Sequence, residues 1–258
     1  MKGALVTGGA RRIGRAIALG LAADGWHVAV HHNSSSYAAD ETVAAIKNVG
    51  GQAVSVQADL SDPQACGRLV AEADGATGGL TCLVNNASVF LEDDIATADA
   101  VSFDAAMAVN LRAPMLLSQA FAACLPEGND GVILNILDQK LDNPNPDFLS
   151  YTLSKYGLAG MTEILAMALG PSIRVCAISP GLTMPSGDQR EEQFRVVHGR
   201  TPLGRGSAPE DVAGAVRYLV GARAVTGETI LVDGGQHLVG STRDVMFLDP
   251  SQDKDETA

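Results

Sequence analysis

Short apolar runs alternate with longer amphipathic stretches along most of the chain. The runs are rich in Val, Ile, Leu and Ala and have the length of strands, whereas the stretches between them repeat apolar residues at helical spacing. Runs this apolar are typical of a parallel sheet that helices cover on both faces. The strands are expected at residues 3–6, 27–31, 53–56, 80–84, 131–136, 173–178 and 229–232.

The helices expected between these strands complete an α/β fold. Right-handed crossovers between parallel strands give a single-domain, doubly wound parallel sheet. We expect one domain over residues 1–240, with a substrate lid at about residues 182–201 that holds a short polar helix from Arg190 to Val197. Residues 241–258 are expected to form a loose polar tail. The longer helices are expected from the glycine-rich turn to about Asp24, at residues 37–49, from Asp62-Pro63, and at residues 100–123, 150–169 and 209–220.

Composition and charge narrow the classes of function. The 258 residues are 46% hydrophobic, which suits one large α/β domain, and the net charge of −12 argues against binding nucleic acid or an anionic membrane. No apolar run has the length of a bilayer span and no signal peptide precedes the first strand, so we expect a cytoplasmic protein. Its histidines and cysteines lack metal-ligand spacing, so no metal site is expected. The cysteines, expected as core residues in a reducing compartment, are Cys66, Cys82, Cys124 and Cys176.

A glycine-rich turn, Thr7 to Gly14, follows the first strand and opens the first helix. Its glycines would let backbone amides approach a pyrophosphate, and a helix N-terminus favours an anion. The turn therefore predicts a nucleotide site, the alternative being an ordinary strand-to-helix turn. The residues that we assign to this site are Gly8, Arg11, Arg12 and Ile13.

The end of the second strand bears on which nucleotide is bound. His32, Asn33 and Ser34 stand where NAD-binding sheets usually carry an acidic residue for the ribose hydroxyls, and the first carboxylate comes only at Asp40. A 2′-phosphate would meet no repulsion here, and Arg11 could pair with it. We therefore predict NADP(H), although the serine run could also be a solvated turn.

Two further strand ends carry residues that we include in the cofactor site. Asp59 and Leu60 follow the third strand, where the carboxylate could accept from the adenine amino group or cap the next helix. Asn86, Ala87 and Ser88 follow the fourth strand, where asparagine could hold a strand end beside a cofactor or simply form a turn.

Tyr151 and Lys155 lie four residues apart, so one helix face carries both a phenol and an ammonium. The ammonium is expected to lower the tyrosine pKa from about 10, which would suit proton exchange with a substrate. Asp138, thirteen residues before the tyrosine, would join this pair. The alternatives are an exposed helix face with an incidental lysine, and an aspartate that merely starts a loop.

The order and spacing of these motifs, together with Asn110, Pro180-Gly181 and Asp233-Gly234-Gly235, resemble the short-chain dehydrogenase/reductase family over about residues 1–240. The resemblance implies a Rossmann-type sheet, hydride transfer with NAD(P)H and a homotetramer. The roles that it implies are Tyr151 as the acid, Lys155 as its tuner and ribose ligand, Asn110 as part of the proton relay, and Pro180 and Gly181 as cofactor contacts.

Departures from the general family pattern resemble its pteridine reductase branch, which includes trypanosomatid pteridine reductases and bacterial dihydromonapterin reductases. The middle glycine of the family's turn is Arg12, the glycine after Asn-Asn-Ala is Ser88 with Phe90 two residues on, and the usual catalytic serine is Asp138. The branch implies that Arg12 reaches cofactor phosphate and pterin and that Ser88 contacts cofactor and substrate. It also implies that Phe90 stacks the pterin on the nicotinamide and that Asp138 and Tyr151 deliver the proton.

Parts of this pattern leave alternatives open. The segment from His32 to Ser34 resembles the branch's His-Arg-Ser cofactor segment, but Asn33 replaces the arginine and shifts phosphate binding to Arg11 and the serines. Phe90 could instead pack in the core, Arg12 could be a surface residue of the first helical turn, and the expected lid could be a plain connecting loop.

These residues predict an NADPH-dependent reductase that transfers hydride to a ring C=N of a pterin, such as dihydromonapterin or dihydrobiopterin, with dihydrofolate a further candidate. Its partner would be a small pterin-like molecule, with Leu182 lining the pocket. A short-chain reductase of a ketone or 3-oxoacyl thioester is one alternative, weakened because Asp138 replaces the alkoxide-binding serine. A non-catalytic NADP(H)-sensing protein is another, weakened because Tyr151, Lys155 and Asn110 are all present.

Overall fold

The computed structural model describes residues 2–185 and 191–247, and these residues form a seven-stranded sheet. All neighbouring strands are parallel, in the order β3-β2-β1-β4-β5-β6-β7. This confirms the doubly wound α/β fold expected from the sequence. The strands are β1 (Gly3–Val6), β2 (His27–His32), β3 (Gln52–Gln57), β4 (Leu80–Asn85), β5 (Gly131–Ile136), β6 (Ile173–Pro180) and β7 (Thr229–Val232).

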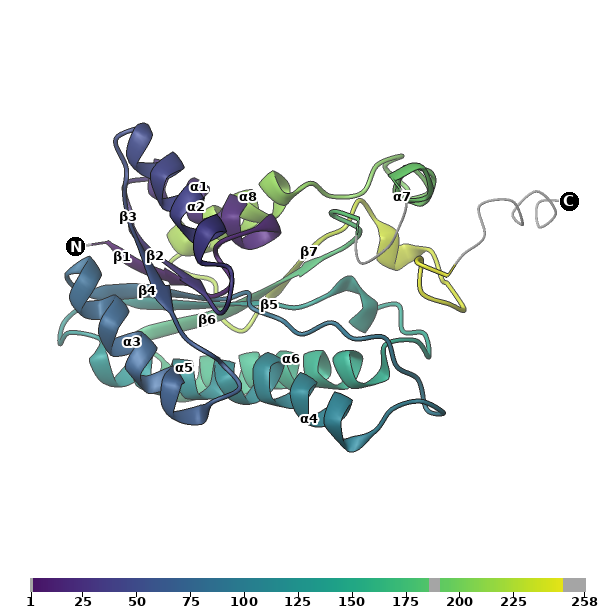
Figure 1. The fold of residues 1–258 in the computed structure, drawn as a ribbon, viewed down its shortest axis with the longest axis horizontal. Helices are drawn as coiled ribbons and strands as arrows, with labels where there is room; N and C mark the ends of the chain where they lie inside the picture. Colours follow the sequence, from purple (N-terminus) through teal and green to yellow (C-terminus); the bar gives the residue numbers. More distant parts are fainter. Residues whose placement is uncertain (1, 186–190, 248–258) are drawn as a thin grey trace, which may run out of the picture.

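Helices cover both faces of the sheet (Figure 1). One layer buries residues such as Ile17, Ile46 and Val216, and the other buries Leu69 and Leu117. The hydrophobic core is therefore divided by the sheet into two parts, as expected for strands that are apolar on both faces. The first layer contains α1 (Arg12–Ala23), α2 (Ser36–Asn48) and α8 (Pro209–Gly221), and the second contains α3 (Pro63–Thr77), α4 (Ala100–Met107), α5 (Ala113–Cys124) and α6 (Leu149–Leu169).

Local signals explain where α3 begins and ends. The side chain of Asp62 accepts a hydrogen bond from the Gln64 amide, and Pro63 takes the first helical position, where no N–H is needed. The helix ends at Gly78, which has a φ of 76° in the left-handed region that glycine enters at low cost. The carboxylate of Asp62 is therefore a helix cap.

The strand order reverses at β1, which lies between β2 and β4. The chain leaving β1 enters α1 on one face of the sheet, and the chain leaving β4 leads to α4 on the other face (Figure 1). Loops that separate in this way leave a crevice at the carboxyl ends of the strands, where ligands of doubly wound sheets bind.

The stretch expected as one helix over residues 100–123 is helical throughout, which confirms that expectation, but it contains an irregular turn. α4 ends at Met107, a π-helical turn spans Ala108–Arg112, and α5 begins at Ala113. Pro114 has no N–H to donate to the carbonyl of Asn110, so the regular hydrogen-bond ladder cannot continue through this point. Asn110 lies in this π-helical turn.

The chain after β6 differs in part from expectation. The short helix of the expected lid is found as α7 (Glu191–His198), and Arg190 lies outside the described residues. Residues 241–247 bond to the loop before α6, so this part is not the loose tail expected for residues 241–258, of which 248–258 lie outside the described residues. No helix within the described ranges combines the length and hydropathy that crossing a bilayer requires.

Candidate active site

A cavity of about 600 Å³ opens at the carboxyl ends of β1, β4, β5 and β6, beside the reversal of strand order. Residues from motifs far apart in the sequence meet in its walls, which makes it the candidate active site. The predicted site residues that line it are Gly8, Arg11, Arg12, Ile13, Asn86, Ala87, Ser88, Phe90, Asp138, Tyr151, Lys155, Pro180, Gly181 and Leu182.

Other predicted site residues lie outside the walls of this cavity. Oδ1 of Asp59 accepts a hydrogen bond from the Ser61 amide at 2.9 Å, so the carboxylate closes a local turn. Its contact with adenine stays a prediction, as do the roles of the residues at the end of β2. The predicted residues outside the cavity walls are His32, Asn33, Ser34, Asp59, Leu60 and Asn110.

Close backbone packing shapes the glycine-rich turn. A Cβ on Gly14 would lie 2.2 Å from the carbonyl oxygen of Gly8, so Gly14 has no room for a side chain. Gly8 itself has a φ of 61°, and Nδ2 of Asn86 donates to the Thr7 carbonyl at 2.8 Å. The turn leads into the N-terminus of α1, and the positive end of a helix dipole suits an anion. These residues therefore fit the pyrophosphate of a dinucleotide.

Arg12 occupies a backbone conformation that usually belongs to glycine. Its φ is 52°, in the left-handed region, which costs a side-chain-bearing residue about 1 kcal/mol. Nη1 of Arg12 donates to the carbonyl of Pro185 at 2.8 Å and so connects the cofactor turn to the segment after β6. Strain of this kind is typical of functional sites, where a side chain is needed at a costly position.

Asn110 supports a wall of the cavity from behind. Its Oδ1 accepts hydrogen bonds from the Val89 amide at 2.7 Å and the Ser88 hydroxyl at 3.2 Å. Its Nδ2 donates to the Val89 carbonyl at 2.9 Å and to Oγ of Ser154 at 3.0 Å. These bonds fix the loop that carries Ser88 and Phe90, and they arise in the π-helical turn. A place for Asn110 in a proton relay stays a prediction.

Asp138 and Tyr151 form a partly buried pair, the acid pair, between the end of β5 and the first turn of α6. The Tyr151 hydroxyl donates to Oδ2 of Asp138 at 2.7 Å. Burial raises the pKa of Asp138, and burial together with the Asp138 charge raises the pKa of Tyr151 well above 10. The expected lowering of the Tyr151 pKa by Lys155 is therefore wrong in this structure. The phenol keeps its proton at neutral pH and can serve as an acid.

Lys155 lies one turn after Tyr151 on the same face of α6, and its side chain is also buried. Its Nζ donates to the carbonyl of Ile136 at 2.7 Å and lies 5.6 Å from the centroid of the Tyr151 ring. Burial lowers the pKa of Lys155 to about 8, against an opposing effect of Asp138. A lysine with this pKa exchanges its proton close to neutral pH, which suits the resupply of a neighbouring acid.

Phe90 presents a flat apolar face in the cavity. Its ring stacks on Phe148 with the centroids 4.2 Å apart and meets the edge of the Tyr151 ring at 4.7 Å. Phe90 is 39% exposed, so it is not the core residue that was its alternative interpretation. A planar ring could stack beside the acid pair at this point.

Several cavity residues had no signal in the sequence. Gln139 and Lys140 follow Asp138 directly, and Asp244 and Met246 come from the stretch that its polar composition predicted to be loose. A lysine in a loop is indistinguishable from a surface lysine until its neighbours in space are known. No group of three or more His, Cys, Asp or Glu that could hold a metal occurs in the described part of the chain.

His31 is a further residue that sequence reasoning missed in favour of its neighbour His32. Its Nδ1 accepts a hydrogen bond from the Gly8 amide at 3.0 Å, and its Nε2 lies 3.1 Å from the Ala58 carbonyl. Burial lowers the pKa of His31 to about 4, so the imidazole is neutral and can accept at one nitrogen while donating at the other. The available signal was a histidine directly after the apolar run Val28 to Val30. It joins the ends of β1, β2 and β3.

Comparison with known proteins identifies the family. Residues 8–237 match the family model described as Enoyl-(Acyl carrier protein) reductase. An uncharacterized oxidoreductase of Methylorubrum extorquens is 38% identical over 91% of this chain and 97% of its own length. A 3-oxoacyl-[acyl-carrier-protein] reductase of Synechocystis is 33% identical over 90% and 95%.

The crystal structure of FolM alternative dihydrofolate reductase 1 from Brucella suis in complex with NADP is also similar. It is 44% identical, has a TM-score of 0.90, and is matched over 94% of this chain and 98% of that one. With the parallel sheet, the glycine-rich turn and the paired tyrosine and lysine all in place, the chain belongs to the short-chain dehydrogenase/reductase family of oxidoreductases.

Proposed function

We propose that this protein is an NADPH-dependent reductase that transfers hydride to a ring C=N of a pterin, either a dihydropterin such as dihydromonapterin or dihydrobiopterin, or dihydrofolate. The observation that carries the proposal is the 2.7 Å hydrogen bond between Tyr151 and Asp138, beside the exposed ring of Phe90 in the cavity. Reduction of a C=N bond requires a proton at nitrogen, and a buried phenol–carboxyl pair can provide it.

NADP(H) is the cofactor in this proposal. The glycine-rich turn fits a pyrophosphate, and the exposed residues Arg11, Asn33 and Ser34 offer a 2′-phosphate polar partners without a carboxylate. The similar Brucella suis protein was crystallised with NADP. When bound, the reduced cofactor would supply the hydride. Contacts of His32, Asp59 and Leu60 with its adenosine end belong to the same proposal.

The chain's own residues would orient the substrate and handle its proton. Phe90 offers a stacking face worth about 0.5–1.5 kcal/mol beyond the burial of its area. Arg12 and Ser88 offer polar groups at the cofactor side of the cavity, while Leu182 offers an apolar contact. Tyr151 would donate the proton to a ring nitrogen, with the carboxyl of Asp138 holding the phenol in place.

Reduction of a ketone or 3-oxoacyl thioester is the second candidate, because the Synechocystis relative is named for that activity. In that chemistry a hydroxyl beside the tyrosine would hydrogen-bond the developing alkoxide. Here Asp138 takes that position, and its partly buried carboxyl has a pKa raised by desolvation. This carboxyl is the feature that favours a nitrogen heterocycle over a carbonyl.

The test follows NADPH oxidation with dihydrobiopterin, dihydromonapterin, dihydrofolate and an acetoacetyl thioester, and with no substrate added. Pterins should be reduced, and Tyr151→Phe should lower kcat by at least about 100-fold because the proton donor is lost. The Kd for NADPH should stay within about twofold in that variant, because the phenol lies in the reacting part of the cavity. Turnover of the thioester alone would assign the enzyme to carbonyl reduction, and no turnover with any compound would favour an NADP(H) sensor.

We also propose that the chain assembles as a homotetramer in the cytoplasm, as the family resemblance implies. One face of α6 buries Tyr151 and Lys155, and the opposite face carries apolar side chains that are exposed in the single chain. An apolar stripe at helical spacing on a surface helix supports packing against a second copy. The residues of this stripe are Leu153, Tyr156, Ile164 and Met167.

A further inference from the structure

Lys140 is a buried lysine that the proposed reaction does not use. Its side chain is only 3% exposed, and the residue lines the cavity two positions after Asp138. Nζ donates to Oδ2 of Asp244 at 3.0 Å and to Oδ1 of Asn145, and it lies 5.3 Å from the centroid of the Phe148 ring. Because burial of an ammonium is costly, this set of partners is what keeps the side chain in one position.

The backbone of Lys140 holds the carboxyl of Asp138. The Lys140 amide donates to Oδ1 of Asp138 at 2.9 Å, while Oδ2 accepts the hydrogen bond from Tyr151. Each carboxyl oxygen therefore has one fixed partner. Any displacement of Lys140 would move the Asp138 carboxyl relative to the phenol.

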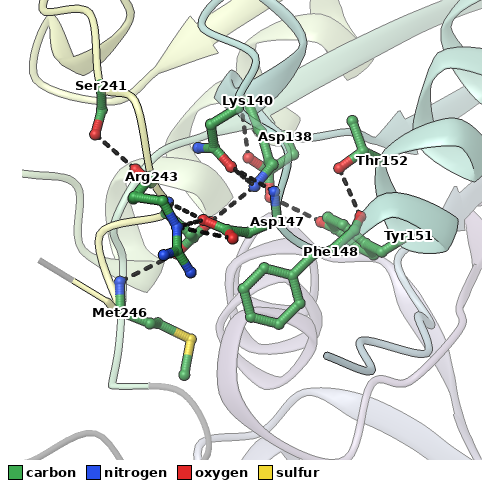
Figure 2. Close-up of polar contacts among 11 residues, drawn as sticks. Asp138, Lys140, Asp147, Phe148, Tyr151, Thr152, Ser241, Arg243 and Met246 are labelled. Atoms are coloured by element: carbon green, nitrogen blue, oxygen red, sulfur yellow. Dashed lines mark hydrogen bonds and ion pairs between the residues drawn. The ribbon is translucent and has the colours of Figure 1, made fainter. Parts of the chain in front are cut away.

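Asp244 brings the end of the described chain against this loop. Its amide donates to Oδ2 of Asp147 at 2.6 Å, and Nε of the neighbouring Arg243 donates to both oxygens of Asp147 at 3.0 and 2.9 Å. Figure 2 shows Arg243 reaching Asp147 close to Lys140 and Asp138. Two carboxylates and two cations thus tie the segment to the connection between β5 and α6, which carries Asp138.

The residues after Asp244 complete a wall of the cavity. Val245 and Met246 line it, and the ring of Phe247 stacks on Phe148 with the centroids 5.7 Å apart. Phe148 in turn stacks on Phe90, whose exposed face is the proposed platform for the substrate ring. The segment from Arg243 to Phe247 therefore contacts the substrate region directly and supports the platform through Phe148.

We propose that the buried Lys140–Asp244 ion pair is a positioning element for catalysis. It fixes residues 243–247 as a wall of the substrate cavity and holds the Asp138 carboxyl in register with Tyr151. The inference rests on the proposed function, since Lys140 and Asp244 are argued to position the Asp138–Tyr151 pair that protonates the substrate. A purely structural ion pair would affect folding stability, whereas a positioning pair affects kcat in a protein that still folds and binds NADPH.

The charge of Asp244 also acts on the acid pair. Burial is the main reason for the raised pKa values of Asp138 and Tyr151, and the Asp244 carboxylate raises both further. Neutralising Asp244 should therefore move ionisation of the pair to lower pH. The charged groups that surround the pair are Lys140, Lys155 and Asp244, with Asp147 and Arg243 behind them.

The test compares Lys140→Met, Lys140→Arg and Asp244→Asn in the full chain. Lys140→Met should lower kcat by about 100-fold for whichever pterin the wild type reduces, because a small displacement of a catalytic group has an effect of this size. The Kd for NADPH should change by less than about twofold, since the cofactor turn is not touched. Lys140→Arg should restore most of the turnover, and Asp244→Asn should shift the basic limb of the pH profile to lower pH.

Asp24→Asn is the matched control. It removes a carboxylate that accepts from Nε of Arg217 at 2.6 Å on the surface between α1 and α8, outside the cavity. Exposed ion pairs of this kind contribute little to folding stability, and this one does not touch the cavity. The turnover and the pH profile should therefore stay as in the wild type. Circular dichroism checks that each variant folds, and Lys140→Arg and Asp244→Asn give the answer if Lys140→Met does not fold.

Failure of this inference is distinguishable from failure of the proposed function. If the wild type reduces a pterin and the Lys140 and Asp244 variants behave like Asp24→Asn, the positioning role is wrong and the proposed function stands. If the wild type reduces no pterin, the proposed function is wrong. The variants are then compared on whichever substrate the wild type reduces, where unchanged kcat in Lys140→Met again overturns the positioning role.

Discussion

At the scale of single residues, burial and one neighbouring carboxyl decide where the proton of Tyr151 resides. The phenol points its hydrogen at Asp138, and Lys155 donates to a backbone carbonyl. Both partners of the phenol–carboxyl pair have raised pKa values, chiefly because burial penalises their charged forms. The phenol of Tyr151 therefore keeps its proton at neutral pH, which is the state that a proton donor requires.

Asp138→Asn tests this coupling through the pH profile. The amide can still accept the hydrogen bond from Tyr151, but it removes the negative charge that raises the tyrosine pKa. The Tyr151 pKa should fall, so the loss of kcat/KM at high pH should begin at a lower pH than in the wild type. Turnover at neutral pH should fall by about 100-fold or more. A basic limb that stays in place would mean that this carboxyl does not control the phenol.

His31 gives a prediction about stability. Its pKa is lowered from 6.5 to about 4 by burial, so between these values the unfolded chain binds more protons than the folded chain. The contribution of the neutral imidazole is fully present above about pH 6.5 and is lost as the pH falls toward 4. From pH 7 to pH 5 the free energy of unfolding should fall by about 2 kcal/mol, since one pKa unit is worth about 1.4 kcal/mol.

The check is urea unfolding of the wild type and of His31→Leu at both pH values. The variant lacks the titrating group, so its stability should fall less between pH 7 and pH 5. NADPH should also bind more weakly to the variant, because the Gly8 amide loses its partner. Equal pH dependence in the two proteins would assign the acid sensitivity to other groups.

At the scale of elements, the glycine turn and α1 act as one unit. The two are joined where the Cα of Gly14 packs against the Gly8 carbonyl, which leaves no space for a methyl group. The N-terminus of α1 consequently points toward the cavity. The cofactor site therefore depends on the closeness of a helix to the preceding turn as much as on side chains.

Gly14→Ala and Gly67→Ala form a matched pair of substitutions. At Gly14 the new Cβ would lie 2.2 Å from the Gly8 oxygen, so the turn must shift, at a cost of about 1–3 kcal/mol. At Gly67, an exposed position in α3, no atom lies within 4 Å, and alanine should stabilise the helix by up to about 1 kcal/mol. Gly14→Ala should also weaken NADPH binding by about tenfold or more, measured by calorimetry. Similar NADPH affinities in the two variants would contradict a role for this close approach.

The elements show what pattern reasoning can and cannot provide. Apolar periodicity predicted each of the strands and most helices, because a buried sheet or helix face requires apolar residues at a fixed spacing along the chain. It gave no sign of the π-helical turn after Met107, because the apolar repeat continues through the point that the backbone of Pro114 makes irregular. It also placed Tyr151 and Lys155 on one face correctly but could not predict the direction of the tyrosine pKa, because that depends on desolvation.

At the scale of the whole molecule, the order and direction of the strands bring the site residues together. Residues from the ends of β1, β4, β5 and β6 meet because parallel strands present their carboxyl ends at one edge. Motifs at those strand ends were predictable, since each carries glycine or polar residues after an apolar run. Lys140, Asp244 and Phe247 were not, because a contact between the loop after β5 and the end of the chain has no local spacing to reveal it.

The exposed stripe of α6 connects the site to the proposed assembly. This helix is buried on the side of Tyr151 and Lys155, while Ile164 and Met167 on the other side are 61% and 77% exposed. Light scattering should give about four times the chain mass of 26.6 kDa. Ile164→Glu should reduce that mass, because a carboxylate cannot be buried in an apolar contact without a partner, whereas Tyr37→Glu on α2, at a residue 75% exposed, should not. Since α6 carries Tyr151, the Ile164 variant should also lose turnover in proportion to its dissociation. A fully active monomer would show that the site is complete in one chain and that the stripe serves another purpose.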